Sequence, residues 1–255
     1  MLNYVEYGKE NKYDDDIFFQ KYSQMSRSQQ GLAGAGEWET LRKLLPDFKD
    51  KRVLDLGCGY GWHCIYAMEH GASSVVGVDI SHKMLEVAKE KTHFPQVEYK
   101  CCAIEDVEFP EESFDVILSS LAFHYVADYE ILVKKIYRIL KSGGKLVFTV
   151  EHPVFTAYGT QDWYYNEKGE ILHFPVDNYY YEGKRTAVFL GEKVTKFHRT
   201  LTTYLNTLLS NGFIINHIVE PQPPENMMDI PGMQDEMRRP MMLIVSANKK
   251  VDRVK

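Results

Sequence analysis

Short apolar runs alternate with helical patterns over residues 52–150, and this alternation limits the chain to few folds. Strand-like runs lie at 52–56, 74–78, 97–101, 114–119 and 144–150. Between the last two runs, apolar residues from 132 to 140 recur at helical spacing before the pair Gly143–Gly144. Strands that alternate with helices are typical of a parallel sheet covered by helices. We therefore predict a doubly wound α/β fold with a mainly parallel sheet.

Residues 155–199 differ from this core, since they hold eleven aromatic residues and show no strong periodicity. Open α/β sheets bind ligands at the carboxyl ends of their strands, so we expect an aromatic lid insertion over that edge. A helix is predicted at about 200–211, with strands at 213–219 and 241–247. The expected organisation is an N-terminal helical cover (1–50), an α/β core (51–152), a lid (153–199) and the C-terminal part of the core (200–255).

The composition excludes several classes of protein. Hydrophobic residues make up 44% and charged residues 26%, as in ordinary soluble domains. The formal net charge is −6 and no Lys/Arg run stands out beyond Lys249–Lys250 near the end of the chain, which disfavours a nucleic-acid partner. We expect no membrane span and no signal peptide, because the required apolar runs are missing. The spacing of the four cysteines and nine histidines predicts a cytoplasmic protein with reduced thiols and no metal site.

Residues 53–61 read Val-Leu-Asp-Leu-Gly-Cys-Gly-Tyr-Gly, a buried strand that runs into a turn with three glycines. Glycine lets the backbone approach a bound nucleotide closely, and the helix that follows offers N–H donors. The next strand ends at Asp79, where a carboxylate can accept hydrogen bonds from both hydroxyls of a ribose. We therefore predict a nucleoside cofactor. The alternatives are glycines that serve packing alone and an Asp79 that caps the next helix.

The spacing Gly57-x-Gly59-x-Gly61 differs from the Gly-x-Gly-x-x-Gly of dinucleotide-binding folds. Asp55 precedes the first glycine by two positions, and its carboxylate would repel a pyrophosphate. A ligand with a sulfonium and an amino group suits this charge, so S-adenosylmethionine is favoured over NAD. An NAD-dependent oxidoreductase and a non-catalytic S-adenosylmethionine-binding protein remain the alternatives.

On these motifs the chain resembles the class I S-adenosylmethionine-dependent methyltransferases, in particular the methyltransferase-domain-11 type that acts on small molecules. Residues 53–61 match the first motif of that family, residues 113–119 its fourth-strand motif, and residues 140–148 its fifth strand. The resemblance implies a Rossmann-like methyltransferase fold with seven strands and an antiparallel last strand. It also implies S-adenosylmethionine as the cofactor and S-adenosylhomocysteine as the product.

The resemblance further implies which residues bind the cofactor. The glycine turn would take its methionine part, Asp79 its ribose, and Ile80 and Met84 its adenine. Ala103 stands where many relatives have an aspartate that binds adenine, so adenine contacts would fall to the residues that follow. We add Arg27 as a candidate partner of the methionine carboxylate. The implied set is Asp55, Gly57, Cys58, Gly59, Gly61, Asp79, Ile80, Met84, Ile104, Glu105 and Ser119.

Methyl transfer is an in-line displacement, in which the enzyme mainly aligns the reactants and helps to remove a proton. His124 and His152 leave the fourth and fifth predicted strands at the carboxyl edge, and histidine titrates near neutral pH. Both are therefore candidates for a general base, and both have the alternative of a packed structural role. The aromatic lid favours a planar or apolar small molecule, or an amine held by cation–π contacts, as the acceptor.

Overall fold

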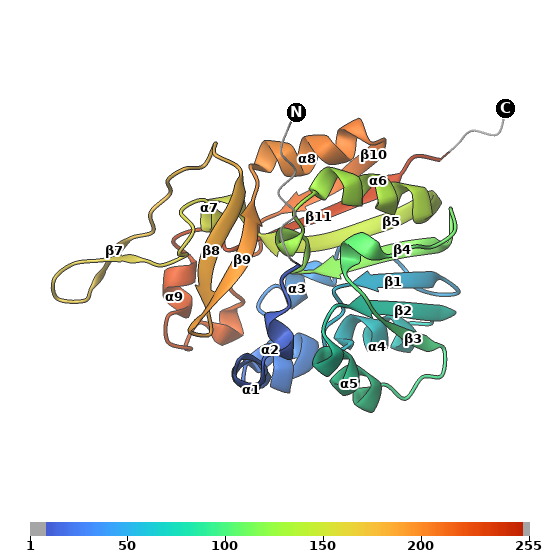
Figure 1. Ribbon diagram of the computed structural model, residues 1–255, viewed down its shortest axis with the longest axis horizontal. Coiled ribbons are helices and arrows are strands. Elements are labelled where there is room, and N and C mark those ends of the chain that lie inside the picture. Colours follow the sequence, from blue (N-terminus) through green and yellow to red (C-terminus); the bar gives the residue numbers. More distant parts are fainter. Residues whose placement is uncertain (1–8, 252–255) are drawn as a thin grey trace.

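Strands β4 (Phe114–Ser120) and β5 (Leu140–Glu151) lie near the middle of a seven-stranded sheet with the order β10-β11-β5-β4-β1-β2-β3. The computed structural model describes residues 9–251; residues 1–8 of the predicted cover and 252–255 of the predicted core lie outside the described residues. Neighbouring strands are parallel from β5 to β3, whereas β11 is antiparallel to both β5 and β10. The predicted α/β fold is confirmed (Figure 1). The other strands are β1 (Arg52–Leu56), β2 (Ser74–Asp79), β3 (Val97–Cys101), β10 (Phe213–Val219) and β11 (Met242–Lys249).

Helices cover both faces of the sheet, because successive strand residues point to opposite sides. Leu54 and Leu56 of β1 join an apolar cluster that includes residues of α6 (Tyr129–Ile139) and α8 (Leu201–Ser210). Val53, between them, joins a second cluster on the other face. That cluster includes residues of α3 (Trp38–Leu41), α4 (Trp62–Glu69) and α5 (His82–Lys91). Both faces are thus used for the core, and the strand ends are left to carry a site.

Helix α6 ends earlier than its sequence pattern predicts. The pattern indicates a helix up to Gly143–Gly144, but α6 ends at Ile139 and β5 begins at Leu140. Leu140 is extended, fully buried and paired with Phe114, so burial in the sheet outweighs the helical spacing. Gly143 has φ +72°, and the register between β4 and β5 shifts just after Phe114. The glycines therefore allow an irregular start to a long strand.

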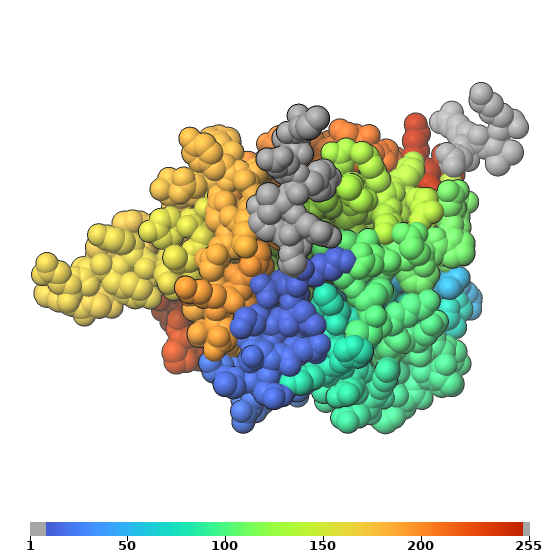
Figure 2. Space-filling view, viewed as in Figure 1, coloured from blue at the N-terminus to red at the C-terminus, as the bar shows by residue number. Residues whose placement is uncertain are grey.

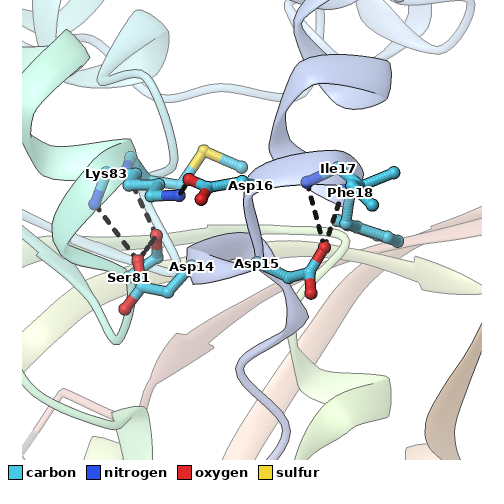
Figure 3. Close-up of polar contacts among 8 residues, drawn as sticks. Asp14, Asp15, Asp16, Ile17, Phe18, Ser81 and Lys83 are labelled. Carbon is cyan, nitrogen blue, oxygen red and sulfur yellow. Dashed lines mark hydrogen bonds and ion pairs between the residues drawn. The ribbon is translucent and has the colours of Figure 1, made fainter.

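The described part of the N-terminal cover, residues 9–50, contains short helices. Asp15 caps α1 by accepting hydrogen bonds from the backbone N–H groups of Ile17 and Phe18 (Figure 3). Trp38, Leu41, Leu44 and Leu45 are spaced as on one face of a helix, but α3 is a single turn, after which the chain continues in turns toward Pro46. The elements of the cover are η1 (Lys12–Asp14), α1 (Asp16–Ser23), α2 (Ser26–Gln29), η2 (Gly31–Gly34) and α3.

The lid contains two β-hairpins, which could not be predicted from its irregular sequence. One projects away from the sheet at the left of the molecule, and the other stands between it and the core (Figures 1 and 2). A short turn and helix from the link before β11 lie beside them, namely η5 (Glu225–Met227) and α9 (Met233–Glu236). The lid elements are α7 (Pro153–Thr156), β6 (Tyr164–Tyr165), β7 (Ile171–His173), β8 (Gly183–Phe189) and β9 (Glu192–His198). Within the described residues, no helix has the length and apolar character needed to cross a membrane.

Candidate functional site

A cavity of about 720 Å³ lies at the carboxyl edge of the sheet, between the N-terminal cover and the lid. Its size suits a cofactor together with a second small ligand, since ligand pockets commonly measure about 300–1,000 Å³. The predicted site residues divide into two groups around it. Those that line the cavity are Arg27, Gly57, Gly59, Asp79, Ile80, Met84, Ile104, Glu105 and His124. Those outside the lining are Asp55, Cys58, Gly61, Ser119 and His152.

The three glycines of the turn are needed for three different reasons. All have positive φ, of +77°, +52° and +74° for Gly57, Gly59 and Gly61. A Cβ on Gly57 would meet the Cβ of Ala122 at 2.4 Å, and one on Gly61 would meet the Oη of Tyr99 at 2.2 Å. A Cβ on Gly59 would meet no atom within 4 Å, because it would project into open space. Gly59 alone of the three thus offers bare backbone to a ligand.

Asp79 is fixed beside this turn by two backbone hydrogen bonds. Its Oδ2 accepts from the N–H of Gly59 at 2.9 Å, and its Oδ1 accepts from the N–H of Ser81 at 2.9 Å. Burial raises the pKa of Asp79, against the opposing effect of these two bonds. Each carboxylate oxygen retains a lone pair, so the group can accept two further hydrogen bonds from a ribose. The position and the remaining acceptors both fit the predicted nucleoside.

Asp55 lies beneath the glycine turn and not in the cavity wall. Its side chain is 1% exposed, and its Oδ2 accepts a hydrogen bond from the Cys64 thiol at 3.5 Å. Its Oδ1 has no partner among the described residues. Burial raises the pKa of Asp55 to about 7. The carboxyl group of Asp55 can therefore act on a bound methyl donor only through the turn, and not by direct contact.

Cys58, Gly61 and Ser119 also support the turn from outside the cavity. The N–H of Cys58 donates to the carbonyl of Val78 at 2.9 Å, and the N–H of Gly61 donates to the carbonyl of Cys58 at 2.9 Å. The hydroxyl of Ser119 donates to the carbonyl of Leu56 at 2.7 Å, across β4 and β1. These contacts hold the turn in the shape that exposes Gly59.

The wall expected to face adenine is largely apolar. Ile80 and Met84 line it from the start of α5, and Ala103 and Ile104 line it from the segment after β3. The backbone carbonyl of Glu105 accepts a hydrogen bond from the Lys135 ammonium at 2.7 Å, which fixes this segment. A small side chain at 103 leaves room for a flat ring. The cavity, the bare backbone at Gly59 and the carboxylate of Asp79 together fit S-adenosylmethionine.

Arg27 reaches the cavity already paired. Its Nη2 lies 2.9 Å from both oxygens of Glu37, and the carboxylate of Glu37 is almost fully buried. Both residues line the cavity. The pair presents a guanidinium with further N–H donors and a carboxylate side by side, a match for a zwitterionic amino acid group.

The N-terminal cover is tied directly to the helix that follows Asp79 (Figure 3). The Oδ1 of Asp14 accepts hydrogen bonds from the Ser81 hydroxyl at 2.6 Å and from the N–H of Lys83 at 3.2 Å. Asp16 forms an ion pair with the Lys83 ammonium. Tyr13, next to Asp14, lines the cavity and packs edge-to-face on Tyr22 at 5.2 Å between ring centroids. Docking of the cover on α5 thus closes the cavity with two tyrosines.

His124 lies in η4 (Phe123–Tyr125), just after β4, and it lines the cavity. Its Nδ1 accepts a hydrogen bond from the backbone N–H of Glu151 at 3.4 Å. Burial lowers the pKa of His124 to about 4, against the attraction of the Glu151 carboxylate. A neutral ring whose Nδ1 accepts must carry its proton on Nε2. The ring is thus arranged as a hydrogen-bond donor through Nε2.

His152 serves the lid. Its Nδ1 accepts a hydrogen bond from the N–H of Val154 at 3.1 Å and so caps α7. Its Nε2 lies 2.9 Å from a carboxylate oxygen of Glu220, in the link before β11. Burial lowers the pKa of His152, against the effect of Glu220. The structure does not bring this ring to the cavity beside His124.

Sequence reasoning missed a buried charged cluster in the cavity wall. The Lys196 ammonium lies 2.5 Å from Oε1 of Glu151, and it donates to Oε1 of Gln161 at 2.9 Å. The amide of Gln161 in turn donates to Oε2 of Glu151 at 2.6 Å. Burial alone would raise the pKa of Glu151, but His124 and Lys196 hold it below its ordinary value. Lys196 lies two positions after Val194 on β9, so the two side chains share one face of the strand and both are buried. A lysine on the buried face of a strand is the signal in the sequence.

The projecting hairpin is held to the link before β11 by an arginine among aromatic rings. The Arg239 guanidinium lies 4.5 Å from the ring centroid of Phe155, 4.8 Å from Phe174 and 5.1 Å from Trp163. Its Nη1 also lies 2.6 Å from a carboxylate oxygen of Glu236. This arrangement positions Trp163, which lines the cavity. Residues 9–251 contain no group of three His, Cys, Asp or Glu side chains placed to hold a metal ion.

Comparison with known proteins places these features in a family. Residues 54–148 match the model of the family described as "Methyltransferase domain". A Listeria monocytogenes protein, assigned as an S-adenosylmethionine dependent methyltransferase, is 58% identical with a TM-score of 0.83, over 86% of this chain and 99% of that chain. An S-adenosylmethionine dependent methyltransferase from Mesorhizobium loti is 40% identical with a TM-score of 0.79, over 86% of this chain and 100% of that chain.

A curated relative matches less than half of the chain. The ubiquinone biosynthesis O-methyltransferase of Coxiella burnetii is 36% identical over 112 residues, which are 43% of this chain and 47% of that protein. The two solved structures, by contrast, match the chain over nearly their whole length. The chain therefore belongs to the S-adenosylmethionine-dependent methyltransferases, is an enzyme of that family, and takes S-adenosylmethionine as its cofactor.

Proposed function

We propose that the protein transfers the methyl group of S-adenosylmethionine, by in-line displacement, to a small molecule bound in the same cavity. The observation that carries this proposal is the single cavity that extends from Gly59 and Asp79 to His124 and Trp163. An acceptor in its second half would have direct access to the cofactor's methyl group. When bound, the cofactor supplies the electrophilic methyl carbon. We also propose a cytoplasmic location, on the sequence grounds given above.

Roles in cofactor binding follow from the placement of each residue. Asp79 accepts hydrogen bonds from the ribose hydroxyls, and Gly59 lets the backbone approach the ligand. The Arg27–Glu37 pair faces the methionine end, and the apolar wall at Ile80 and Met84 receives adenine. Asp55, Cys58, Gly61 and Ser119 act through the shape of the turn, since none of them lines the cavity.

His124 orients the acceptor in this proposal and does not act as a general base. Its Nδ1 lone pair is occupied by the N–H of Glu151, and a pKa of about 4 makes it a weak base. Nε2–H can donate to a lone pair on the acceptor. His124→Gln keeps a donor and should reduce turnover less than tenfold, whereas His124→Phe should reduce it by about a hundredfold. Equal losses in both variants would favour the base instead.

The experiment that tests the function uses S-adenosylmethionine with an isotopically labelled methyl group. The purified protein is incubated with it and with an extract of small metabolites, and the products are separated by mass. We expect the label in a small organic product with the wild-type protein and none with Asp79→Ala. Saturable binding of S-adenosylhomocysteine, with no labelled product from broad extracts, would contradict catalysis and favour a non-catalytic binding protein.

A further inference from the structure

The far half of the cavity is an apolar arm. We define it by six residues of the link before β11 and of its first strand positions: Met227, Ile230, Pro231, Met233, Met241 and Met242. Met242 pairs with Glu151 across β11 and β5, on the opposite side of β4 from the glycine turn. Strands β11 and β1 are three strand spacings of about 4.8 Å apart, so the arm begins roughly 14 Å from the end of β1. Methionine side chains are flexible and adapt to an apolar ligand.

Lys196 stands where the apolar arm meets the cofactor half. Its ammonium lies 5.5 Å from the ring centroid of Phe189 and 6.0 Å from that of Tyr125, and all three residues line the cavity. The residue is only 2% exposed. An ammonium has three N–H donors, and the described residues engage two of them, through Glu151 and Gln161. The third donor is left for a ligand.

The acidic groups near the arm are already engaged. Asp235 is paired with Arg238 at 3.0 Å, and Glu236 with Arg239 at 2.6 Å. Glu10 accepts a hydrogen bond from the backbone N–H of Thr195 at 2.6 Å. Glu151 itself is bonded through both oxygens, to Lys196 and Gln161. At this junction the Lys196 ammonium is therefore the charged donor that the wall offers a ligand. The carboxylates nearby are already bonded to other protein groups.

We propose that Lys196 anchors the methyl acceptor, and that the acceptor has an apolar body and an oxygen that accepts a hydrogen bond. The body would fill the apolar arm, and the oxygen, a carboxylate above all, would meet the third N–H of Lys196. The inference rests on the proposed function, because it assigns the acceptor half of the same cavity. It excludes an alkylammonium head at this position, because an ammonium group has no lone pair with which to accept the third N–H of Lys196.

The test measures how tightly two probes with the same apolar body bind. The probes are 4-pentylbenzoate and 4-pentylbenzylamine, titrated by calorimetry into the protein saturated with S-adenosylhomocysteine. We expect the wild-type protein to bind the benzoate at least tenfold more tightly than the amine. Lys196→Met should remove this preference, while Lys193→Met, an exposed change on the same strand, should retain it. The preference should also be lost in a double variant described next.

Lys196→Met leaves the buried carboxylate of Glu151 unpaired, which can unfold the protein. The double variant Lys196→Met/Glu151→Gln removes both charges and keeps an amide beside Gln161, so it retains a folded test of the proposal. Equal affinity for the two probes in the wild-type protein, or a tenfold preference that survives in the double variant, would overturn the inference.

Failure of the proposed function gives a different result. If the wild-type protein does not bind S-adenosylhomocysteine, the proposed function falls. The probe preference is then read on the protein without S-adenosylhomocysteine and decides the role of Lys196 separately. Equal weakening of both probes by Lys196→Met would show that the side chain only shapes the cavity, and it would also overturn the inference.

Discussion

The carboxylate of Asp79 accepts a hydrogen bond from the backbone N–H of Gly59 at 2.9 Å. This contact joins the end of β2 to the turn after β1, the two places where we propose that the cofactor is held. Because Gly59 is the one glycine of the turn whose missing side chain leaves open space, the bond fixes bare backbone and a carboxylate together. The cofactor half of the cavity is therefore organised by the protein's own contacts.

Substitutions at two glycines of the turn should have different effects, one mainly on stability and the other mainly on cofactor binding. In Gly61→Ala the new methyl group would lie 2.2 Å from the Oη of Tyr99, whereas in Gly59→Ala it meets only the cavity. We expect Gly61→Ala to lower the free energy of unfolding by about 2–4 kcal/mol, and Gly59→Ala by about 1 kcal/mol. Gly59→Ala should nevertheless weaken S-adenosylhomocysteine binding at least tenfold. Urea unfolding and calorimetry measure these quantities.

Tyr99, which the new methyl group in Gly61→Ala would meet, provides a control for the loss of stability. Tyr99→Phe removes the clashing hydroxyl, so it should restore part of the stability lost in Gly61→Ala. A Gly59→Ala protein that binds S-adenosylhomocysteine like the wild type would contradict the role assigned to this backbone.

Asp55 should make stability depend on pH. Burial raises its pKa from 3.8 to about 7, so the folded protein binds this proton more tightly than the unfolded chain does. That contribution is present in full below the unfolded pKa and is lost as the pH rises through about 7. From about pH 5.5 to 8, the free energy of unfolding of the wild type should fall by about 2 kcal/mol relative to Asp55→Asn. Parallel urea-unfolding profiles of the two proteins would contradict the assignment.

Arg239 should hold the projecting hairpin in place. Arg239→Met removes a guanidinium that lies within 5.1 Å of three ring centroids. Buried cation–π contacts contribute about 2 kcal/mol, so amide hydrogen exchange in residues 161–174 should accelerate about thirtyfold. Affinity for S-adenosylhomocysteine should stay unchanged, because the stack lies in the acceptor half. Exchange as slow as in a Lys168→Met control, at the hairpin tip, would show that other contacts fix the hairpin.

The sheet could be predicted because its residues repeat a simple pattern. Buried parallel strands are short apolar runs, and the run at 52–56 coincides with β1. The strand expected at 97–101 coincides with β3, an edge strand of mixed polarity. The glycine turn could also be predicted, because the strand, the glycines and Asp79 follow one another along the chain. The boundary between α6 and β5 at Leu140 could not be predicted, because pairing with Phe114 overrides the local helical spacing.

The acceptor half depends on contacts between distant segments, which the sequence does not order. Lys196 meets Glu151 across 45 residues, and neither has a local motif. His152 resembles His124 in sequence position at a strand end, yet its ring turns to cap α7 and approaches Glu220 instead. Asp55 precedes the glycines closely, but alternation along β1 directs its side chain beneath the turn. In each case the direction of the side chain determines whether the residue reaches the cavity.

The central claim is that Asp79 and the glycine turn hold S-adenosylmethionine in the cavity that also receives the acceptor. Calorimetric titration with S-adenosylhomocysteine, of the wild type and of Asp79→Ala, tests it most directly. We expect saturable binding to the wild type and at least a tenfold loss in the variant, as befits two hydrogen bonds to a charged group. Equal affinity in both proteins, or saturable binding of NADH with none of S-adenosylhomocysteine, would contradict the account.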